Sequence, residues 1–206
     1  MIRLAAASAC RLYHCIYIYP VLNVRHPFTC TGPCVSLPLH WHALTSATLE
    51  ECPGVNDGFL LHMLSRAQSL YSLSVVGCSC VTATGFSSMM CTRLCQLEIV
   101  RCASVEPDVV MAASVQSISR SLCSLNISQG YLGALQLQQL QLISTLVLDM
   151  CAGVTPAAAA AVVGGCRLLK LLSAAGVAAF GCHEVRQDFF LQSQIVTIGA
   201  GADVSA

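Results

Sequence analysis

The sequence predicts an α/β solenoid, in which short strands and helices alternate along a stack of repeated units. Three observations predict this class: an apolar pattern recurs about every 25 residues, helix-start signals follow its copies, and the composition supplies a large interior. Hydrophobic residues make up 55% of the 206 residues and charged residues only 10%. A single unit of this size cannot bury its own apolar face, so the units must stack on one another.

The recurring pattern has five apolar positions, counted from a first leucine or isoleucine. Apolar residues stand at the third and fifth positions after it, a cysteine at the eighth and a valine at the eleventh. The copies begin at Leu44, Leu70, Leu94, Leu122, Ile143 and Leu168. The copy at Leu122 has glycine in place of the cysteine and valine, and the copy at Leu168, with Leu171 at its third position, is incomplete. Repetition at this spacing indicates structural repeats.

Each copy predicts a short strand, a turn and a helix. The apolar third and fifth positions lie two residues apart, as on the buried face of a strand. Helix-start signals follow at Asn56-Asp57, over 82–84, at Pro107-Asp108 and at Thr155-Pro156, where a capping hydroxyl precedes a first-turn proline. Apolar stretches then predict helical structure over 59–64, 109–115 and 157–163.

The composition excludes several classes of protein. Intrinsic disorder requires low hydrophobicity and high charge, the opposite of this chain. No apolar run reaches the roughly 20 residues of a membrane-spanning helix, because polar side chains dilute residues 121–148 and Pro156 interrupts residues 150–166. A nucleic-acid binder normally shows a basic stripe, whereas residues 50–206 carry seven basic and ten acidic residues.

Fourteen cysteines are many for a chain of this length. Disulfide scaffolds are usually short secreted chains that lack a large core, whereas reduced cysteines serve as small buried hydrophobes. The cysteines at the eighth repeat position are Cys52, Cys78, Cys102 and Cys151. Their shared position favours packing in a common interior, and Cys91 and Cys166, shortly before strands, are expected to pack there as well.

The repeat resembles the cysteine-containing subtype of leucine-rich repeat, familiar from F-box/leucine-rich-repeat proteins. The resemblance covers roughly residues 44–180 and implies an arc with parallel strands on its concave face and helices on its convex face. We expect an N-terminal arm at 1–43, a leucine-rich-repeat solenoid of about six repeats at 44–194, and a C-terminal strand and tail at 195–206. Residues 15–24 have strand-like composition and are expected to cap or extend the sheet.

In this geometry the second, fourth and sixth positions of each repeat face the concave surface. The partner-binding residues expected there are Glu50, Ser72, Ser74, Gln96, Glu98, Ser124, Asn126, Thr145, Asp149 and Lys170. Small hydroxyl groups and a few acids suit a protein or peptide, and the absence of arginine argues against a phosphate backbone. The alternative is a solvated concave face with partners bound elsewhere. Alanines at 157–161 make the helical side unusually apolar, which is typical of a surface covered in an assembly.

The N-terminal arm has a charge pattern of its own. The first 49 residues contain Arg3, Arg11 and Arg25 and no acid. An acid-free start with arginines resembles a mitochondrial targeting sequence, so we expect the mitochondrial matrix, with the cytoplasm as the alternative. The same arginines are the only residues of the arm from which we expect RNA contacts.

One group of side chains in the arm has the chemistry of a zinc site. Cys30, Cys34, His40 and His42 are four ligands of the kinds that bind zinc tetrahedrally. Their spacing matches no common zinc module, and the chain contains no phosphate-binding loop, nucleophile elbow or metalloprotease motif. We therefore expect no metal or other cofactor, no small-molecule substrate and no enzymatic activity.

The function these observations favour is that of a non-catalytic, protein-binding scaffold subunit of a larger assembly. The repeat, the low charge and the targeting-like start fit a mitochondrial complex such as the mitochondrial ribosome or the ATP synthase, and small mitochondrial leucine-rich-repeat proteins resemble this chain in size. The alternative is a substrate-recognition module of a ubiquitin ligase. That alternative requires a helical adaptor-binding domain before the repeats, and residues 1–43 do not resemble one.

Overall fold

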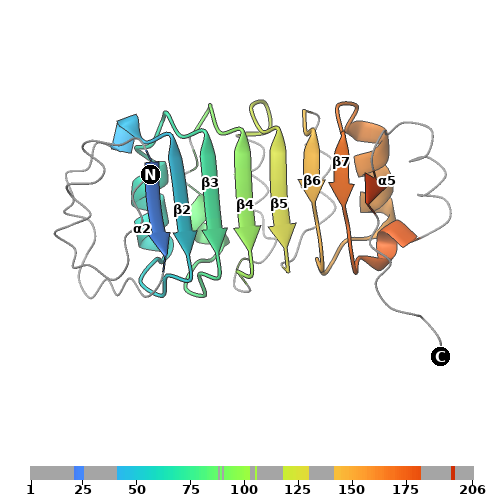
Figure 1. Ribbon diagram of the computed structural model, residues 1–206, viewed down its shortest axis with the longest axis horizontal. Coiled ribbons are helices and arrows are strands. Elements are labelled where there is room, and N and C mark those ends of the chain that lie inside the picture. Colours follow the sequence, from blue (N-terminus) through green and yellow to red (C-terminus); the bar gives the residue numbers. More distant parts are fainter. Residues whose placement is uncertain are drawn as a thin grey trace.

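The computed structural model describes residues 21–25, 41–87, 89, 91–102, 105, 118–129, 142–181 and 196–197. In this part of the chain, eight strands form one sheet, in the order in which they occur in the sequence (Figure 1). Every neighbouring pair is parallel. The strands are β1 (Val21–Arg25), β2 (Ser46–Glu50), β3 (Ser72–Val76), β4 (Gln96–Val100), β5 (Ser124–Ser128), β6 (Thr145–Val147), β7 (Leu171–Ser173) and β8 (Val196–Thr197). The predicted α/β class with parallel strands is confirmed.

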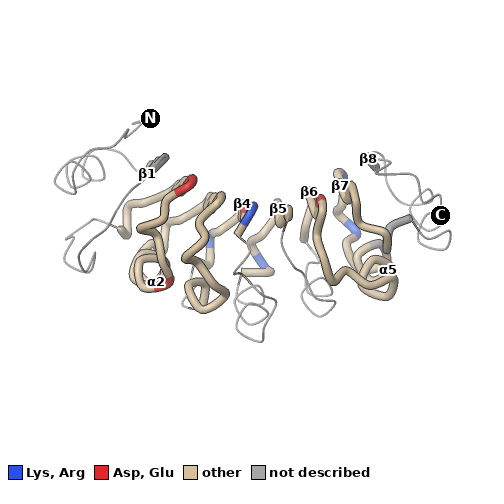
Figure 2. The backbone as a smooth tube through the Cα atoms, turned by 90° about the horizontal axis from the view of Figure 1, so that it is seen from below, with Lys and Arg blue, Asp and Glu red and all other residues tan. Residues whose placement is uncertain are grey.

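Helices lie on one side of this sheet. The α-helices are α2 (Asp57–Leu64) and α5 (Pro156–Gly165), and the short 3-10 helices are η2 (Trp41–Ala43), η3 (Ala83–Phe86) and η4 (Ala178–Gly181). Seen from below, the sheet curves into an arc, with the strands on the inner side and α2 and α5 on the outer side (Figure 2). These two helices therefore leave the concave face of the sheet uncovered.

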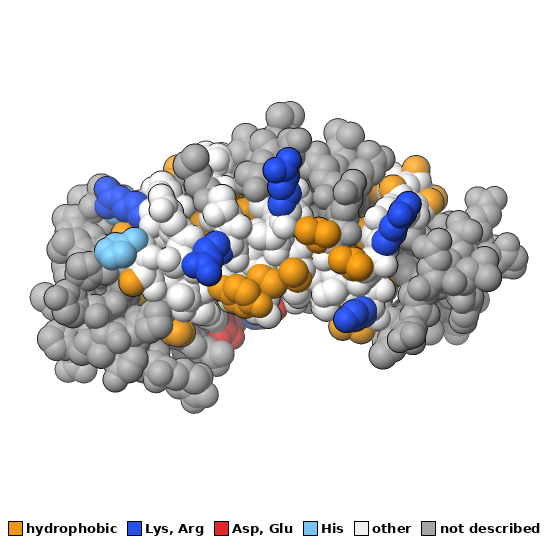
Figure 3. Space-filling view, turned by 90° about the horizontal axis from the view of Figure 1, so that it is seen from above, with side chains coloured by type: hydrophobic (Ala, Val, Ile, Leu, Met, Phe, Trp, Pro, Cys, Tyr) orange, Lys and Arg blue, Asp and Glu red, His pale blue; other side chains and the backbone are white. Residues whose placement is uncertain are grey.

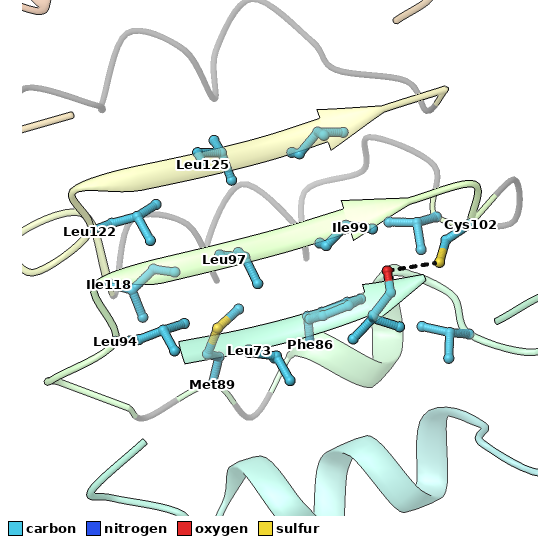
Figure 4. Close-up of a cluster of buried hydrophobic side chains, with 14 of the residues drawn as sticks. Leu73, Phe86, Met89, Leu94, Leu97, Ile99, Cys102, Ile118, Leu122 and Leu125 are labelled. Carbon is cyan, nitrogen blue, oxygen red and sulfur yellow. Dashed lines mark hydrogen bonds between the residues drawn. The ribbon is translucent and has the colours of Figure 1, made fainter. Parts of the chain in front are cut away.

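Residues at the same repeat position pair with one another across the sheet. Leu73 pairs with Leu97, and Leu97 pairs with Leu125. These three leucines are at most 2% exposed and share one cluster with Phe86 and Met89 (Figure 4). Since burial of a leucine contributes about 2 kcal/mol, stacking of the units supplies the stability that a single unit lacks.

The repeat cysteines connect neighbouring units. All four at the eighth position are buried, as predicted, and so are Cys91 and Cys166. In three units the thiol donates to a backbone carbonyl in the preceding unit, always at the fifth repeat position; Figure 4 shows the bond of Cys102. The pairs are Cys78 with Leu49, Cys102 with Val75 and Cys151 with Ile127. Because thiols are weak donors, their packing is the larger contribution.

The seventh repeat position has a left-handed backbone in every described unit from β2 to β7. These residues, with φ between 52° and 73°, are Glu51, Gly77, Arg101, Gln129, Met150 and Gly176. Only glycine adopts this conformation without strain. A Cβ at Gly77 would lie 3.2 Å from Glu51 Cγ, and the Glu51 Oε1 atom lies 3.5 Å from Arg101 Nη2. This ion pair links two units that are not adjacent.

The unit that contains β7 corrects one sequence prediction. The prediction placed the first leucine of this unit at Leu168, which is wrong by one residue. Leu146 pairs with Leu172, and Leu172 is 1% exposed, whereas Leu168 is 53% exposed. The predicted register would bury the hydroxyl of Ser173 in the core, whereas the observed register buries Ala174 there. The cost of burying a hydroxyl without a partner favours the observed register.

The helix-start signals are confirmed wherever the structure describes them. The Asn56 side chain accepts a hydrogen bond from the Phe59 N–H at 3.0 Å, and the Thr155 hydroxyl accepts one from the Ala158 N–H at 3.2 Å. Thr82 caps η3 in the same way. The helical structures expected over 59–64 and 157–163 correspond to α2 and α5, and the one expected over 109–115 lies outside the described residues.

Asp57 holds two consecutive units together. Its carboxylate accepts hydrogen bonds from the Thr82 backbone N–H at 2.7 Å and from the Thr82 hydroxyl at 2.6 Å. Hydrogen bonds to a charged acceptor are worth about 1.5 to 3 kcal/mol, so we expect Asp57→Ala to lower the free energy of unfolding by about 2 kcal/mol in urea titrations. Glu51→Ala removes an ion pair whose side chains are 47% and 49% exposed and should cost less than about 1 kcal/mol. Equal losses in the two variants would contradict this role of Asp57.

The sheet extends beyond the repeats that the sequence pattern identified. β1 overlaps the strand-like segment 15–24 and pairs with β2, while β8 lies in the C-terminal segment and pairs with β7. The first 20 residues, with Arg3 and Arg11, lie outside the described part of the chain.

Candidate functional site

Most of the predicted partner-binding side chains lie on the concave face. Along β2 to β5, buried residues alternate with residues that point away from the core. The predicted residues in this second group are Glu50, Ser72, Ser74, Gln96, Glu98, Ser124, Asn126 and, on β6, Thr145. The placement of Lys170 on this face is wrong. Its N–H bonds to the Ser144 carbonyl at 2.8 Å, one residue before β7, because of the register correction above.

Glu98 is the centre of a hydrogen-bonded row across three strands. Its Oε2 accepts from the Ser74 hydroxyl at 2.6 Å and its Oε1 accepts from the Asn126 amide at 2.9 Å. The Ser128 hydroxyl donates in turn to Asn126 Oδ1 at 2.6 Å. Ser74, Glu98 and Asn126 pair across the sheet, so the row follows from the repeat. Both carboxylate oxygens of Glu98 accept hydrogen bonds from neighbouring side chains. Glu98 therefore holds these side chains in place on the concave face.

Asp149 orders the other end of the concave face. Its Oδ1 accepts from the Ser173 hydroxyl at 2.7 Å and from the Ala175 N–H at 2.8 Å. The charged side chains that the structure describes on this face, Glu50, Glu98 and Asp149, are all acidic. The concave face therefore combines small polar side chains with valines such as Val76 and Val100, and its described charges are acidic.

A second surface lies where the strands begin, and the sequence prediction missed it. Its basic residues, all exposed, are Arg66, Arg93, Arg120, Arg167 and Lys170. Its exposed apolar residues are Tyr71 at 50%, Leu142 at 42%, Leu168 at 53% and, at the first residue of β7, where this edge meets the concave face, Leu171 at 36%. Figure 3 looks onto this edge and shows basic and apolar side chains interspersed over it, with acidic ones only at the concave rim. We refer to these nine residues as the strand-start edge.

The two ends of the strands differ in charge. The acidic residues that the structure describes lie in the middle of a strand, at its last residue or beyond it; they are Glu50, Glu51, Asp57, Glu98 and Asp149. Arg101 is the one described basic side chain at that opposite end, and it pairs with Glu51. The sequence does contain a signal for the basic edge. A basic residue stands within four positions before Leu70, Leu94 and Leu122, but its offset varies and the five-position pattern omits it.

An open hollow of about 570 Å³ lies on the strand-start edge, lined among others by Tyr71, Arg93, Cys95 and Ser121. A side-chain hydrogen bond with Cys95 is the main cause that raises the pKa of Tyr71. A side-chain hydrogen bond between the free thiols of Cys95 and Cys123, the residue before β5, likewise raises the pKa of Cys123. Tyr71 and Arg93 therefore both line the hollow.

The buried thiols are expected to be unreactive. Burial raises the pKa of Cys91, Cys102 and Cys166 to about 11, and alkylating reagents attack the thiolate. We expect iodoacetamide at pH 8 to modify the exposed Cys80 at least tenfold faster than these three, as measured by mass spectrometry of peptides. Modification of Cys102 as fast as Cys80 would contradict the packing of the repeat cysteines.

The described part of the chain holds no group of three or more side chains arranged to bind a metal ion. Of the four residues in the zinc hypothesis, His42 lies in η2, and Cys30, Cys34 and His40 lie outside the described residues. The zinc hypothesis is therefore not tested. None of the helices that the structure describes has the length and apolar character needed to cross a membrane.

Comparisons with known proteins assign this chain to no family. No protein-family model and no curated protein matches the sequence. The functional conclusion therefore depends on the repeat and on the chemistry of the two surfaces.

Proposed function

We propose that this chain is a leucine-rich-repeat solenoid of the cysteine-containing subtype and acts as a non-catalytic, protein-binding subunit of a larger assembly. The observation that carries the proposal is the concave face, an extended surface across β2 to β7 whose small polar groups are ordered by Glu98 and Asp149. Small molecules are usually bound in enclosed, mostly apolar pockets, whereas an extended surface suits a protein segment.

Three repeated features support the solenoid assignment. Each unit from β2 to β7 contributes one strand to the sheet, in the order of the sequence. The thiol of the eighth position bonds to the preceding unit in three places. The seventh position is left-handed in six successive units. Contacts of this kind between neighbouring units are typical of repeat proteins.

The composition of the outer surface supports a place in an assembly. Only 10% of the residues are charged. In α5, Ala158 and Ala159 are buried while Ala157 and Ala160 are exposed, so the outer side of this helix offers methyl groups to its surroundings. Apolar surface of this kind is commonly covered by another protein. The acid-free arm, with Arg3 and Arg11, supports the mitochondrial matrix as the location of that assembly.

Sedimentation of the tagged chain from its source cells tests this proposal. We expect it in the protease-protected mitochondrial fraction, in particles much larger than the free chain of 21.7 kDa. A chain that sediments alone at its own mass would overturn the assembly. Co-sedimentation with cytosolic ubiquitin-ligase components would instead favour the substrate-recognition alternative.

A further inference from the structure

We propose that the strand-start edge is the docking site for an acidic protein segment that also carries apolar side chains. This inference rests on the proposed protein-binding function and adds the place and the chemistry of the partner. The strand-start edge would be a second contact surface beside the concave face, whose described charges are acidic.

Charge is the first argument. Arg66, Arg93, Arg120, Arg167 and Lys170 are exposed, and among the described residues none of them forms an ion pair with an acid. Cations of one sign on one edge raise the local potential, which attracts carboxylates and orients an approaching acidic segment. The opposite edge differs, because there Arg101 is already paired with Glu51.

Apolar exposure is the second, independent argument. Of the five large apolar side chains that stand out as exposed among the described residues, four lie on the strand-start edge, and the fifth, Met150, lies at the opposite end of the strands. Clustering of such residues marks an interaction site. The hollow beside Tyr71 and Arg93 can receive an apolar side chain against the Tyr71 ring while a neighbouring carboxylate binds the Arg93 guanidinium.

These two arguments together favour a protein segment over RNA. Single-stranded nucleic acid is bound by cations combined with aromatic rings on which the bases stack. Here one tyrosine is accompanied by three exposed leucines, Leu142, Leu168 and Leu171, which offer no stacking plane. Leucines beside arginines suit a chain in which acidic and apolar residues are interspersed.

Fluorescence anisotropy with synthetic peptides tests the inference. The probe is a labelled, N-acetylated peptide of about 14 residues that mixes glutamate and aspartate with leucine and phenylalanine. Two control peptides replace either the acids by their amides or the apolar residues by serine, and an oligouridine of equal charge represents RNA. We expect the mixed peptide to bind at least tenfold more tightly than any of these three. Equal binding of the serine peptide or of oligouridine would overturn the inference.

Matched variants assign the binding to the edge. We expect Arg93→Glu combined with Arg120→Glu, and separately Tyr71→Ser, to weaken binding of the mixed peptide at least tenfold. Arg101→Glu reverses one charge at the opposite edge, as each of the two arginine substitutions does at the strand-start edge, and Met150→Ser removes the exposed apolar side chain there; both should change the affinity less than twofold. Melting temperatures within a few degrees of the unmodified chain would show that the variants fold. Equal effects at the two edges would overturn the inference.

Lys170 provides a direct readout, because it is the only lysine in the chain. A zero-length carbodiimide should couple carboxylates of the bound peptide to Lys170 Nζ in the unmodified chain and in Arg101→Glu, but not in the Arg93/Arg120 variant. Absence of this cross-link in the unmodified chain would contradict the docking site.

If the Arg93/Arg120 variant keeps every native partner, this inference fails while the proposed function stands. If the unmodified chain has no native partner, the proposed function itself fails.

Discussion

Raising the pH from about 9 to about 11 is expected to remove much of the stability of this protein. In the unfolded chain a cysteine loses its proton near its ordinary pKa of 9.0, whereas burial raises the pKa of Cys91, Cys102 and Cys166 to about 11. Between these values the unfolded state binds fewer protons than the folded state, so the free energy of unfolding falls as the pH rises. Below pH 9 this contribution is fully present.

The expected loss is large relative to the total stability. After allowance for residual solvent screening, each of the three thiols loses about 1 to 2 kcal/mol by pH 11, and the total stability of a domain is about 5 to 15 kcal/mol. Urea titrations at intervals between pH 8 and pH 11 measure the slope. Combined Cys91→Ala, Cys102→Ala and Cys166→Ala should flatten it, whereas Cys80→Ala, at an exposed site, should not. An unchanged slope in the triple variant would contradict this origin.

Replacement of Leu172 by alanine is expected to cost about 3 kcal/mol. Leu172 is 1% exposed and pairs with Leu146, whereas its neighbour Leu171 is 36% exposed. The large cost arises because the lost methyl groups leave a cavity in the core. Leu171→Ala is the matched control, since it removes the same atoms one residue away on the concave side, and it should cost less than about 1 kcal/mol.

Urea unfolding of the two leucine variants distinguishes the two registers of the β7 unit. The register expected from sequence alone buries Leu171 and predicts the opposite order of stability. A larger loss in Leu171→Ala than in Leu172→Ala would therefore contradict the observed pairing of β6 with β7.

The stack of units could be predicted from the sequence because each buried position repeats. Leu73, Leu97 and Leu125 stand at one repeat position and pair across the sheet. Burial of the cysteines was predictable for the same reason. The caps at Asn56 and Thr155 were predictable because capping depends on side chains next to the helix start.

Other features could not be predicted, for identifiable physical reasons. The segment Leu-Leu-Lys-Leu-Leu at 168–172 fits two registers by apolar spacing alone, and the polarity of Ser173 decides between them. The left-handed turns occur at Glu51, Arg101 and other residues that are not glycine, so no residue type marks them. The basic edge becomes visible only when the strand starts are aligned in space, because its arginines precede them at varying distances.

Affinity purification from the source cells, followed by mass spectrometry, tests the central claim most directly. The claim is that this chain works by binding another protein. We predict that the unmodified chain and the Arg101→Glu variant purify with the same stoichiometric partner, and that this partner contains an acidic segment with interspersed apolar residues. We further predict that the Arg93→Glu/Arg120→Glu variant loses that partner. An unmodified chain that purifies as a stable monomer without partners would contradict the claim.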